Sequence, residues 1–238
     1  MHGDCSEGLS IRGRVVYPGL VQLGIERGFS SAYRGRGAFE RAMTDYAFLK
    51  ERVGPWIAYP FLAQIFAGAS AKELGALSRG HFEGVLSGHF YPGAKRLFDG
   101  LSALGVEQHV LSASPEIFVR GAASCLGVPA GRLHGIRLRA PRGKLARELA
   151  YPVTYAEGKV AKLSLIVKAS TTESRGRPVF VLGAFGDSPD NDGPLLAHVS
   201  GLALPSGTTV AALVNAEPTD SKDARLQSIR FTPAPLSG

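Results

Sequence analysis

Short apolar segments alternate with amphipathic segments from about residue 90 onward, and this alternation restricts the possible folds most. Strand-like segments are "EQHVLS" (107–112), "LHGIRLR" (133–139) and "PVFVLGAF" (178–185), and helical ones are "GAKRLFDGLSALG", "PEIFVRGAASCLG", "GKVAKLSLIVKAS" and "GPLLAHVS". This order predicts an α/β fold, a Rossmann-like parallel sheet with helices on both faces. In such sheets ligands bind beyond the carboxyl ends of the strands, so we look for functional residues there.

The first ninety residues have a different character and read as helical. Phe39, Met43, Tyr46 and Leu49 recur at steps of three and four, and Ser70 and Glu73 have the spacing of a capping box. We therefore predict a mostly helical cap over residues 1–90. A Rossmann-like core would follow over 91–216, and a polar, proline-containing tail over 217–238.

The formal net charge of +7 suits an anionic partner, and residues 132–147, "RLHGIRLRAPRGKLAR", supply much of the positive excess. No aromatic residue interrupts this run to stack on bases. We therefore interpret the run as a solvated hairpin or loop. A basic nucleic-acid-binding module remains a weaker alternative.

The N-terminus has no basic region followed by an apolar one, so it does not resemble a secretory signal. The most apolar stretch, residues 55–69, is shorter than the ~20 residues that a membrane-spanning helix needs, and we expect a buried or lid helix there. Cys5 and Cys125 lie far apart without metal-ligand spacing, which fits a reducing compartment. These features favour a cytoplasmic protein that does not bind a membrane.

The segment "VLSASPE" (110–116) ends a predicted strand and begins a predicted helix. We expect the Ser112 hydroxyl to face the crevice and Ser114 to cap the helix. The Ser112 hydroxyl and the backbone amides of Ala113 and Ser114 would then suit a phosphate group. A simple helix cap is the alternative, and it accounts for Ser114 but only permits Ser112.

Lys159 lies in "YAEGKV" at the start of a predicted helix, where the helix dipole disfavours a cation. This placement suggests a nearby anion, although an exposed lysine is the common alternative.

The segment "VLGAFGDSPDNDGPLL" (181–196) places Asp187 at a strand end and Asp190 and Asp192 in a predicted loop. Mg²⁺ takes oxygen ligands, usually one or two carboxylates with water and a substrate phosphate. Asp187 therefore suits a Mg²⁺ ligand, and Asp192 a second ligand or its support. An Asx-turn with a helix cap would explain Asp190, Asn191 or Asp192, but not Asp187.

Together these segments resemble the haloacid dehalogenase (HAD) superfamily of Mg²⁺-dependent phosphatases, within it the phosphoserine-phosphatase-like branch. "VLSASPE", "YAEGKV" and "GDSPDNDGPLL" look like its second, third and fourth motifs, and the likeness runs from about residue 60 to 205. The resemblance implies that Ser112 and Lys159 bind the transferring phosphoryl group and that Asp187 binds Mg²⁺. The second acid of the fourth motif falls on Asp190 or Asp192, and we assign Asp192.

Members of that family also have an early strand ending in Asp-x-Asp, whose first aspartate is the nucleophile, and this chain has none before its helical segment. Its first residues, with Asp4 and Glu7, look like those that follow the motif, so neither is assigned a catalytic role. We expect that the chain starts downstream of the motif. We also expect that the central first strand is absent, which would leave strand edges unpaired and the fold poorly stable.

The resemblance thus implies a Mg²⁺-dependent phosphomonoester hydrolase that acts on a small phosphorylated substrate and is inactive as this chain alone. The alternative is a catalytically dead HAD-like protein that binds a phosphorylated ligand or a protein partner.

Overall fold

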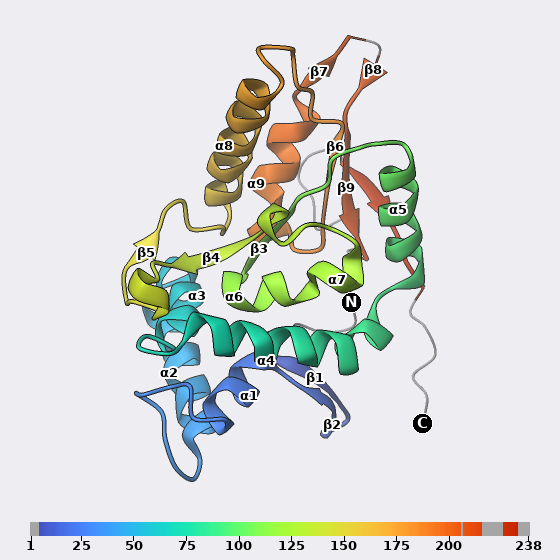
Figure 1. Ribbon diagram of the computed structural model, residues 1–238. Coiled ribbons are helices and arrows are strands. Elements are labelled where there is room, and N and C mark those ends of the chain that lie inside the picture. Colours follow the sequence, from blue (N-terminus) through green and yellow to red (C-terminus); the bar gives the residue numbers. More distant parts are fainter. Residues whose placement is uncertain (1–4, 206, 216–225, 233–238) are drawn as a thin grey trace. The chain divides into compact units, whose positions relative to one another are not determined.

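The computed structural model describes residues 5–205, 207–215 and 226–232 and divides the chain into two compact units. The first unit runs to Val153, and the second comprises Thr154–Phe231 (Figure 1). Each unit combines helices with a three-stranded sheet, which confirms the predicted α/β class.

The first unit begins with a β-hairpin and four helices, and a small sheet with further helices follows. Its strands are β1 (Gly8–Ile11), β2 (Arg14–Pro18), β3 (Val110–Pro115), β4 (Leu133–Leu138) and β5 (Leu149–Ala150). Its helices are α1 (Leu20–Glu26), α2 (Ala38–Arg52), α3 (Pro55–Gln64), α4 (Ala71–Gly84), α5 (Pro92–Ala103), α6 (Glu116–Val119) and α7 (Ala123–Leu126).

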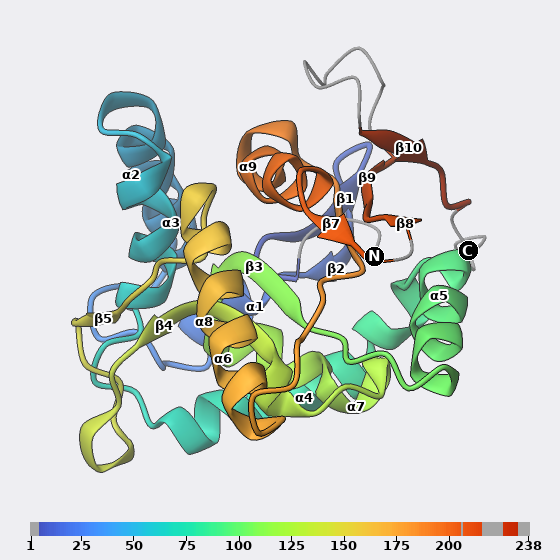
Figure 2. The ribbon, with the colours of Figure 1, turned by 90° about the horizontal axis from the view of Figure 1, so that it is seen from above.

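The helical prediction for the first ninety residues is confirmed from α1 onward. The Ser70 side chain accepts a hydrogen bond from the Glu73 amide at 3.3 Å and caps α4, as the capping-box spacing predicted. Helices α2 and α3 run side by side (Figure 2), and Trp56, the only tryptophan of the chain, lies exposed near the start of α3. Among the described helices, none is long and apolar enough to cross a membrane.

The hairpin β1–β2 was not predicted, because we expected a helix directly after Glu7. Its antiparallel strands are joined by a tight turn in which Arg12 and Gly13 have positive φ. Gly8 also has positive φ, and its backbone approaches Gly19 so closely that a Cβ atom would lie 2.5 Å from the Gly19 nitrogen. The hairpin is therefore fixed by backbone geometry that helical periodicity does not reveal.

The sheet of the first unit has the order β3-β4-β5, with β3 and β4 parallel and β5 antiparallel to β4. Residues 132–147, predicted as a solvated hairpin or loop, contain β4 and most of the loop that leads from β4 to its antiparallel partner β5. Basic side chains of this segment are exposed, namely those of Arg137, Arg139, Arg142, Lys144 and Arg147.

The second unit contains α8 (Glu157–Glu173), β6 (Gly183–Gly186), α9 (Pro189–Ser200), β7 (Ala203–Leu204), β8 (Gly207–Thr208), β9 (Val210–Val214) and β10 (Gln227–Ile229). Its sheet has the order β10-β9-β6, and all three strands are parallel. Helix α9 packs on β6 and β9, and Leu196 from α9 meets Ala211 and Leu213 from β9 in a small core.

The predicted strand over 178–185 is shorter in the structure, because β6 begins only at Gly183. Among the described strands, β3 pairs only with β4 and β6 pairs only with β9, so each strand ends its sheet. Among the described residues, each unit therefore contains one three-stranded sheet. The predicted boundaries near residues 90 and 216 stay predictions.

Candidate active site

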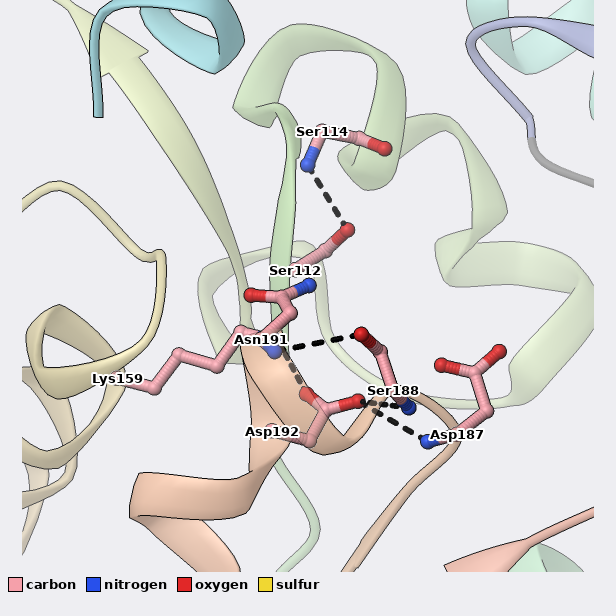
Figure 3. Close-up of polar contacts among 7 residues, drawn as sticks. All are labelled: Ser112, Ser114, Lys159, Asp187, Ser188, Asn191 and Asp192. Carbon is pink, nitrogen blue, oxygen red and sulfur yellow. Dashed lines mark hydrogen bonds and ion pairs between the residues drawn. The ribbon is translucent and has the colours of Figure 1, made fainter. Parts of the chain in front are cut away.

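Four predicted motif residues of the second unit lie together at the carboxyl end of β6. Lys159 projects from the first turn of α8, Asp187 follows β6 directly, and Asp190 and Asp192 lie in the first turn of α9 (Figure 3 shows all but Asp190). Lys159 and Asp192 are both buried and form an ion pair. Lys159 is therefore not the exposed lysine of the alternative interpretation, and the anion that it pairs with is Asp192.

Asp192 uses both of its carboxylate oxygens. Oδ1 accepts a hydrogen bond from the Lys159 Nζ, and Oδ2 accepts bonds from the backbone amides of Asp187 and Ser188 at 3.0 and 3.1 Å. A buried carboxylate needs such partners to remain ionised. Asp192 therefore connects the lysine of α8 to the turn that carries Asp187.

The predicted loop around Asp190 and Asp192 is wrong, because helix α9 begins at Pro189. Ser188 is its N-cap and accepts a hydrogen bond from the Asn191 amide at 3.3 Å, while Pro189 occupies the first turn. Carboxylates in the first turn of a helix are favoured by its dipole, which explains why Asp190 and Asp192 belong there. The sequence analysis began the last helical segment at Gly193 and missed the stronger serine-proline signal five residues earlier.

Gly186 permits the close approach of Asp192 to the end of β6. A Cβ atom on Gly186 would lie 2.4 Å from the Asp192 Cβ and 2.6 Å from its Cγ, which no ordinary packing allows. The glycine at this position is thus a steric requirement of the turn.

Asp187 differs from Asp192 in having an exposed side chain. Partial desolvation raises the pKa of the Asp187 carboxyl above its usual value, the neighbouring Asp192 carboxylate raises it further, and the Lys159 charge opposes both. A cation bound at Asp187 would relieve this unfavourable interaction between two negative charges.

Asn191 offers a further oxygen ligand for such a cation. The sequence analysis named Asn191 only in the Asx-turn alternative. Its Oδ1 atom is buried, and no described residue donates a hydrogen bond to it. A buried amide oxygen without a donor next to an aspartate is a suitable oxygen ligand for Mg²⁺ or a bound water. The described residues hold no group of three or more His, Cys, Asp and Glu side chains that could bind a metal by themselves. The donors present therefore fit Mg²⁺ that keeps water or substrate oxygens in its shell.

The Ser112 region belongs to the first unit, and one prediction about it is wrong. Ser112 Oγ accepts a hydrogen bond from the Ser114 amide at 3.1 Å, while Ser114 remains in β3 and caps no helix. Helix α6 begins only at Glu116, has Pro115 as its N-cap, and lasts four residues. Its short length removes the helix amino terminus that we had expected to bind an anion, and the Ser112 hydroxyl remains as the local polar group.

Glu116 is buried beneath this turn, where it pairs with Arg120 at 2.9 Å and accepts a hydrogen bond from the Gly135 amide at 3.3 Å. Gly135 of β4 is needed for this crossing, because a Cβ atom there would lie 2.5 Å from the Ser114 carbonyl oxygen. The turn after Ser112 is thus held by β4. That Ser112 and Lys159 bind one phosphoryl group stays a prediction.

A sequence model of the haloacid dehalogenase-like hydrolases matches residues 23–197, most of the chain. The chain belongs to this family. The match includes the Ser112, Lys159 and Asp187 motifs, so the resemblance inferred from those motifs is confirmed at the family level.

Solved structures of low sequence identity share the fold of this HAD-like hydrolase. A Bordetella pertussis Tohama I protein of unknown function has a TM-score of 0.65 at 19% identity, with 88% of this chain and 87% of that one covered. Cytosolic 5'-nucleotidase IIIB bound to cytidine has a TM-score of 0.57 at 13% identity, with coverages of 96% and 77%. No curated protein sequence matches the chain.

A probable phosphoserine phosphatase from Vibrio cholerae has a TM-score of 0.54 at 16% identity. The match covers 83% of the HAD-like hydrolase described here and 54% of the Vibrio protein. The chain therefore corresponds to about half of that protein's length.

Proposed function

We propose that this HAD-like hydrolase carries the phosphate and Mg²⁺ sites of a phosphomonoester hydrolase of the phosphoserine-phosphatase type. The supporting observation is the Asp192 carboxylate, which pairs with buried Lys159 and holds the Asp187 turn through two amides. A dianionic phosphate needs a fixed positive charge and a metal ligand together, and this carboxylate connects the two.

In this proposal the Ser112 hydroxyl and the Lys159 ammonium hold the phosphoryl oxygens, while the Ser114 amide supports Ser112 through its hydrogen bond to Oγ. Asp187 is the Mg²⁺ ligand, with Asn191 as a further oxygen donor. Asp192 supports both groups, since its own oxygens already accept three hydrogen bonds. Bound Mg²⁺ would supply positive charge against the phosphoryl oxygens.

No residue of this chain is assigned as the nucleophile. Glu7 is exposed, Asp4 lies outside the described residues, and the resemblance assigns a role to neither. The proposal is therefore a cytoplasmic chain that binds Mg²⁺ and a small phosphorylated compound but does not turn it over alone. A protein that only binds a phosphorylated ligand is the second candidate, because no described residue is assigned as a nucleophile.

Titration calorimetry with Mg²⁺ and inorganic phosphate tests the site. We expect Asp187→Asn to weaken Mg²⁺ binding by about tenfold or more, because it removes the proposed ligand. The matched control is Asp190→Asn, which changes an exposed carboxylate three residues further along, in the first turn of α9. Equal losses in the two variants would refute the assignment of Asp187.

A fusion protein with an Asp-x-Asp strand in front of residue 1 distinguishes phosphate binding from catalysis. Turnover that appears when an Asp-x-Asp strand is fused in front of residue 1 supports the hydrolase. Phosphate binding without turnover in that fusion supports the ligand-binding candidate. Tight binding to nucleic acid that is lost when Arg137, Arg139 and Arg142 are neutralised would instead support the nucleic-acid module.

A further inference from the structure

The turn that leads into helix α8 contains an alanine in a backbone conformation that suits glycine. Ala156 has φ 45° and ψ −120°, close to the values of about +60° and −120° for the second residue of a type II′ β-turn. The Gly158 amide donates a hydrogen bond to the Tyr155 carbonyl oxygen at 2.8 Å, which closes such a turn over residues 155–158. Because a positive φ is unfavourable for a residue with a Cβ atom, Ala156 is strained.

This strained turn sets the start of the helix that carries Lys159. The Lys159 amide donates a hydrogen bond to the Ala156 carbonyl oxygen at 2.9 Å, which joins the strained residue to the first turn of α8. Alanine has no side-chain oxygen to cap a helix, so the type II′ turn takes the place of a cap. A strained backbone conformation persists only where the surrounding contacts impose it. The conformation of Ala156 therefore indicates nearby contacts that hold the turn.

The buried ion pair of Lys159 with Asp192 is such a contact (Figure 3). Lys159 follows Ala156 by three residues, so a change in the turn would move the lysine backbone and its ammonium relative to the Asp192 carboxylate. An ammonium group has three N–H donors, and among the described residues Asp192 alone accepts a hydrogen bond from that of Lys159. Two donors therefore remain for the oxygens of a bound anion.

We propose that Ala156 is a positioning residue for Lys159. Its strained turn and the ion pair of Lys159 with Asp192 hold each other in place, so the ammonium presents its two remaining N–H groups from one fixed point. A phosphoryl group gains more from a donor that is already fixed than from one that must be ordered on binding. This role deepens the proposed function and rests on it for the phosphate experiment alone.

Urea denaturation of the full chain tests for the strain. We expect Ala156→Gly to raise the urea midpoint, because glycine adopts a positive φ without strain, although the change removes a buried methyl group. Ala161→Gly is the matched control, since it makes the same change at an exposed position of α8 and should lower the midpoint, as glycine does inside a helix. A lower midpoint in Ala156→Gly would overturn the proposal.

A second background tests whether the strain is connected with Lys159. In a chain that carries Lys159→Met and Asp192→Asn, no ion pair imposes the turn, and the turn can relax. The gain from Ala156→Gly should then fall to less than about half, while the loss from Ala161→Gly should stay the same. An equal gain in both backgrounds would mean that the strain has no link to Lys159 and would refute the positioning role.

Chemical acetylation of lysines, followed by mass spectrometry, reports on Lys159 if the double background fails to fold. Valine is β-branched and resists a positive φ, so Ala156→Val should open the turn and increase the acetylation of Lys159 several-fold. Lys159 should stay protected in the parent chain, in Ala156→Gly and in the control Ala161→Val, and exposed Lys168 is the internal standard. Unchanged protection of Lys159 in Ala156→Val, with its fold checked by circular dichroism, would contradict the proposal.

Titration calorimetry with inorganic phosphate connects the turn to the proposed site. Ala156→Val should weaken phosphate binding at least about tenfold, because the fixed positive charge is displaced, whereas Ala156→Gly should bind phosphate as the parent chain does. Equal affinity of Ala156→Val and the parent chain would overturn the proposal. A parent chain that binds no phosphate would refute the proposed function, and the denaturation and acetylation experiments would still decide the role of Ala156.

Discussion

Asp192 shows at the residue scale how one side chain can combine two tasks. Its position depends on Gly186, where an added methyl group would overlap the Asp192 Cβ and Cγ atoms. The absence of a side chain at Gly186 therefore lets Asp192 hold both Lys159 and the Asp187 turn in place.

We expect Gly186→Ala to reduce the free energy of unfolding by about 1–3 kcal/mol, because the backbone must move away from Asp192. It should also weaken Mg²⁺ binding. Chemical denaturation and calorimetry measure the two effects. Gly193→Ala is the control, since a Cβ atom at Gly193 in α9 meets nothing within 4 Å and alanine favours a helix. If both alanine variants behave alike, the steric argument fails.

We expect Lys159→Met to destabilise the chain by about 3–5 kcal/mol, because the buried Asp192 carboxylate would lose its countercharge. Adding Asp192→Asn should recover part of that loss in urea denaturation, since the uncompensated charge is then removed. Lys168→Met changes an exposed lysine of the same helix and should stay within about 0.5 kcal/mol of the parent. A double variant less stable than Lys159→Met would contradict this account.

At the scale of single elements, helix α4 and the hairpin β1–β2 are joined by a buried histidine. The His81 Nε2 atom lies 3.0 Å from the Pro18 carbonyl oxygen. Burial lowers the pKa of His81 below its usual value, and the contact with Pro18 opposes this only in part.

Because the pKa of His81 is lower in the folded chain than in the unfolded chain, the folded chain binds fewer protons at a pH between the two pKa values. The free energy of unfolding should therefore fall as the pH drops through about 6.5, the usual value in unfolded chains, towards the lower folded value. Urea denaturation at pH 7.5 and 5.5 measures the change. His81→Gln should reduce the pH dependence, whereas His198→Gln, an exposed control on α9, should not. If the free energy of unfolding of His81→Gln depends on pH as it does in the parent chain, the assignment of this effect to His81 is wrong.

Elements with a strong local signal were predictable from the sequence. The periodicity of α2 and the cap of α4 depend on neighbouring residues, and both are confirmed. The hairpin β1–β2 depends on left-handed backbone conformations, and the extent of β6 depends on its pairing with β9, which covers only Gly183–Gly186. Those causes lie in backbone geometry and long-range pairing, which hydropathy does not encode.

The sequence indicated which residues lie in the candidate site better than it indicated what each of them does there. Lys159, Asp187 and Asp192 lie together as their order along the chain suggested. The hydrogen bonds that occupy both Asp192 oxygens, and the buried amide oxygen of Asn191, follow from the three-dimensional course of α9. A list of acidic residues therefore could not distinguish the metal ligand from its support.

At the scale of the whole molecule, we expect no appreciable hydrolysis of an aryl phosphate by the chain with Mg²⁺, because it has no assigned nucleophile. Release of the aryl alcohol, followed by absorbance, measures this. Turnover abolished by Asp4→Asn would refute our interpretation of the first residues. Glu107→Gln, which changes an exposed carboxylate that belongs to no proposed site, serves as control.

The single tryptophan determines which part of the molecule fluorescence can report. Trp56 lies in the first unit, and the sequence of Thr154–Phe231 has a single tyrosine, Tyr155, and no tryptophan. Indole emission therefore reports on the surroundings of helix α3 in the first unit. Circular dichroism records both units, so its denaturation curve separates from the emission curve whenever the two units melt at different denaturant concentrations.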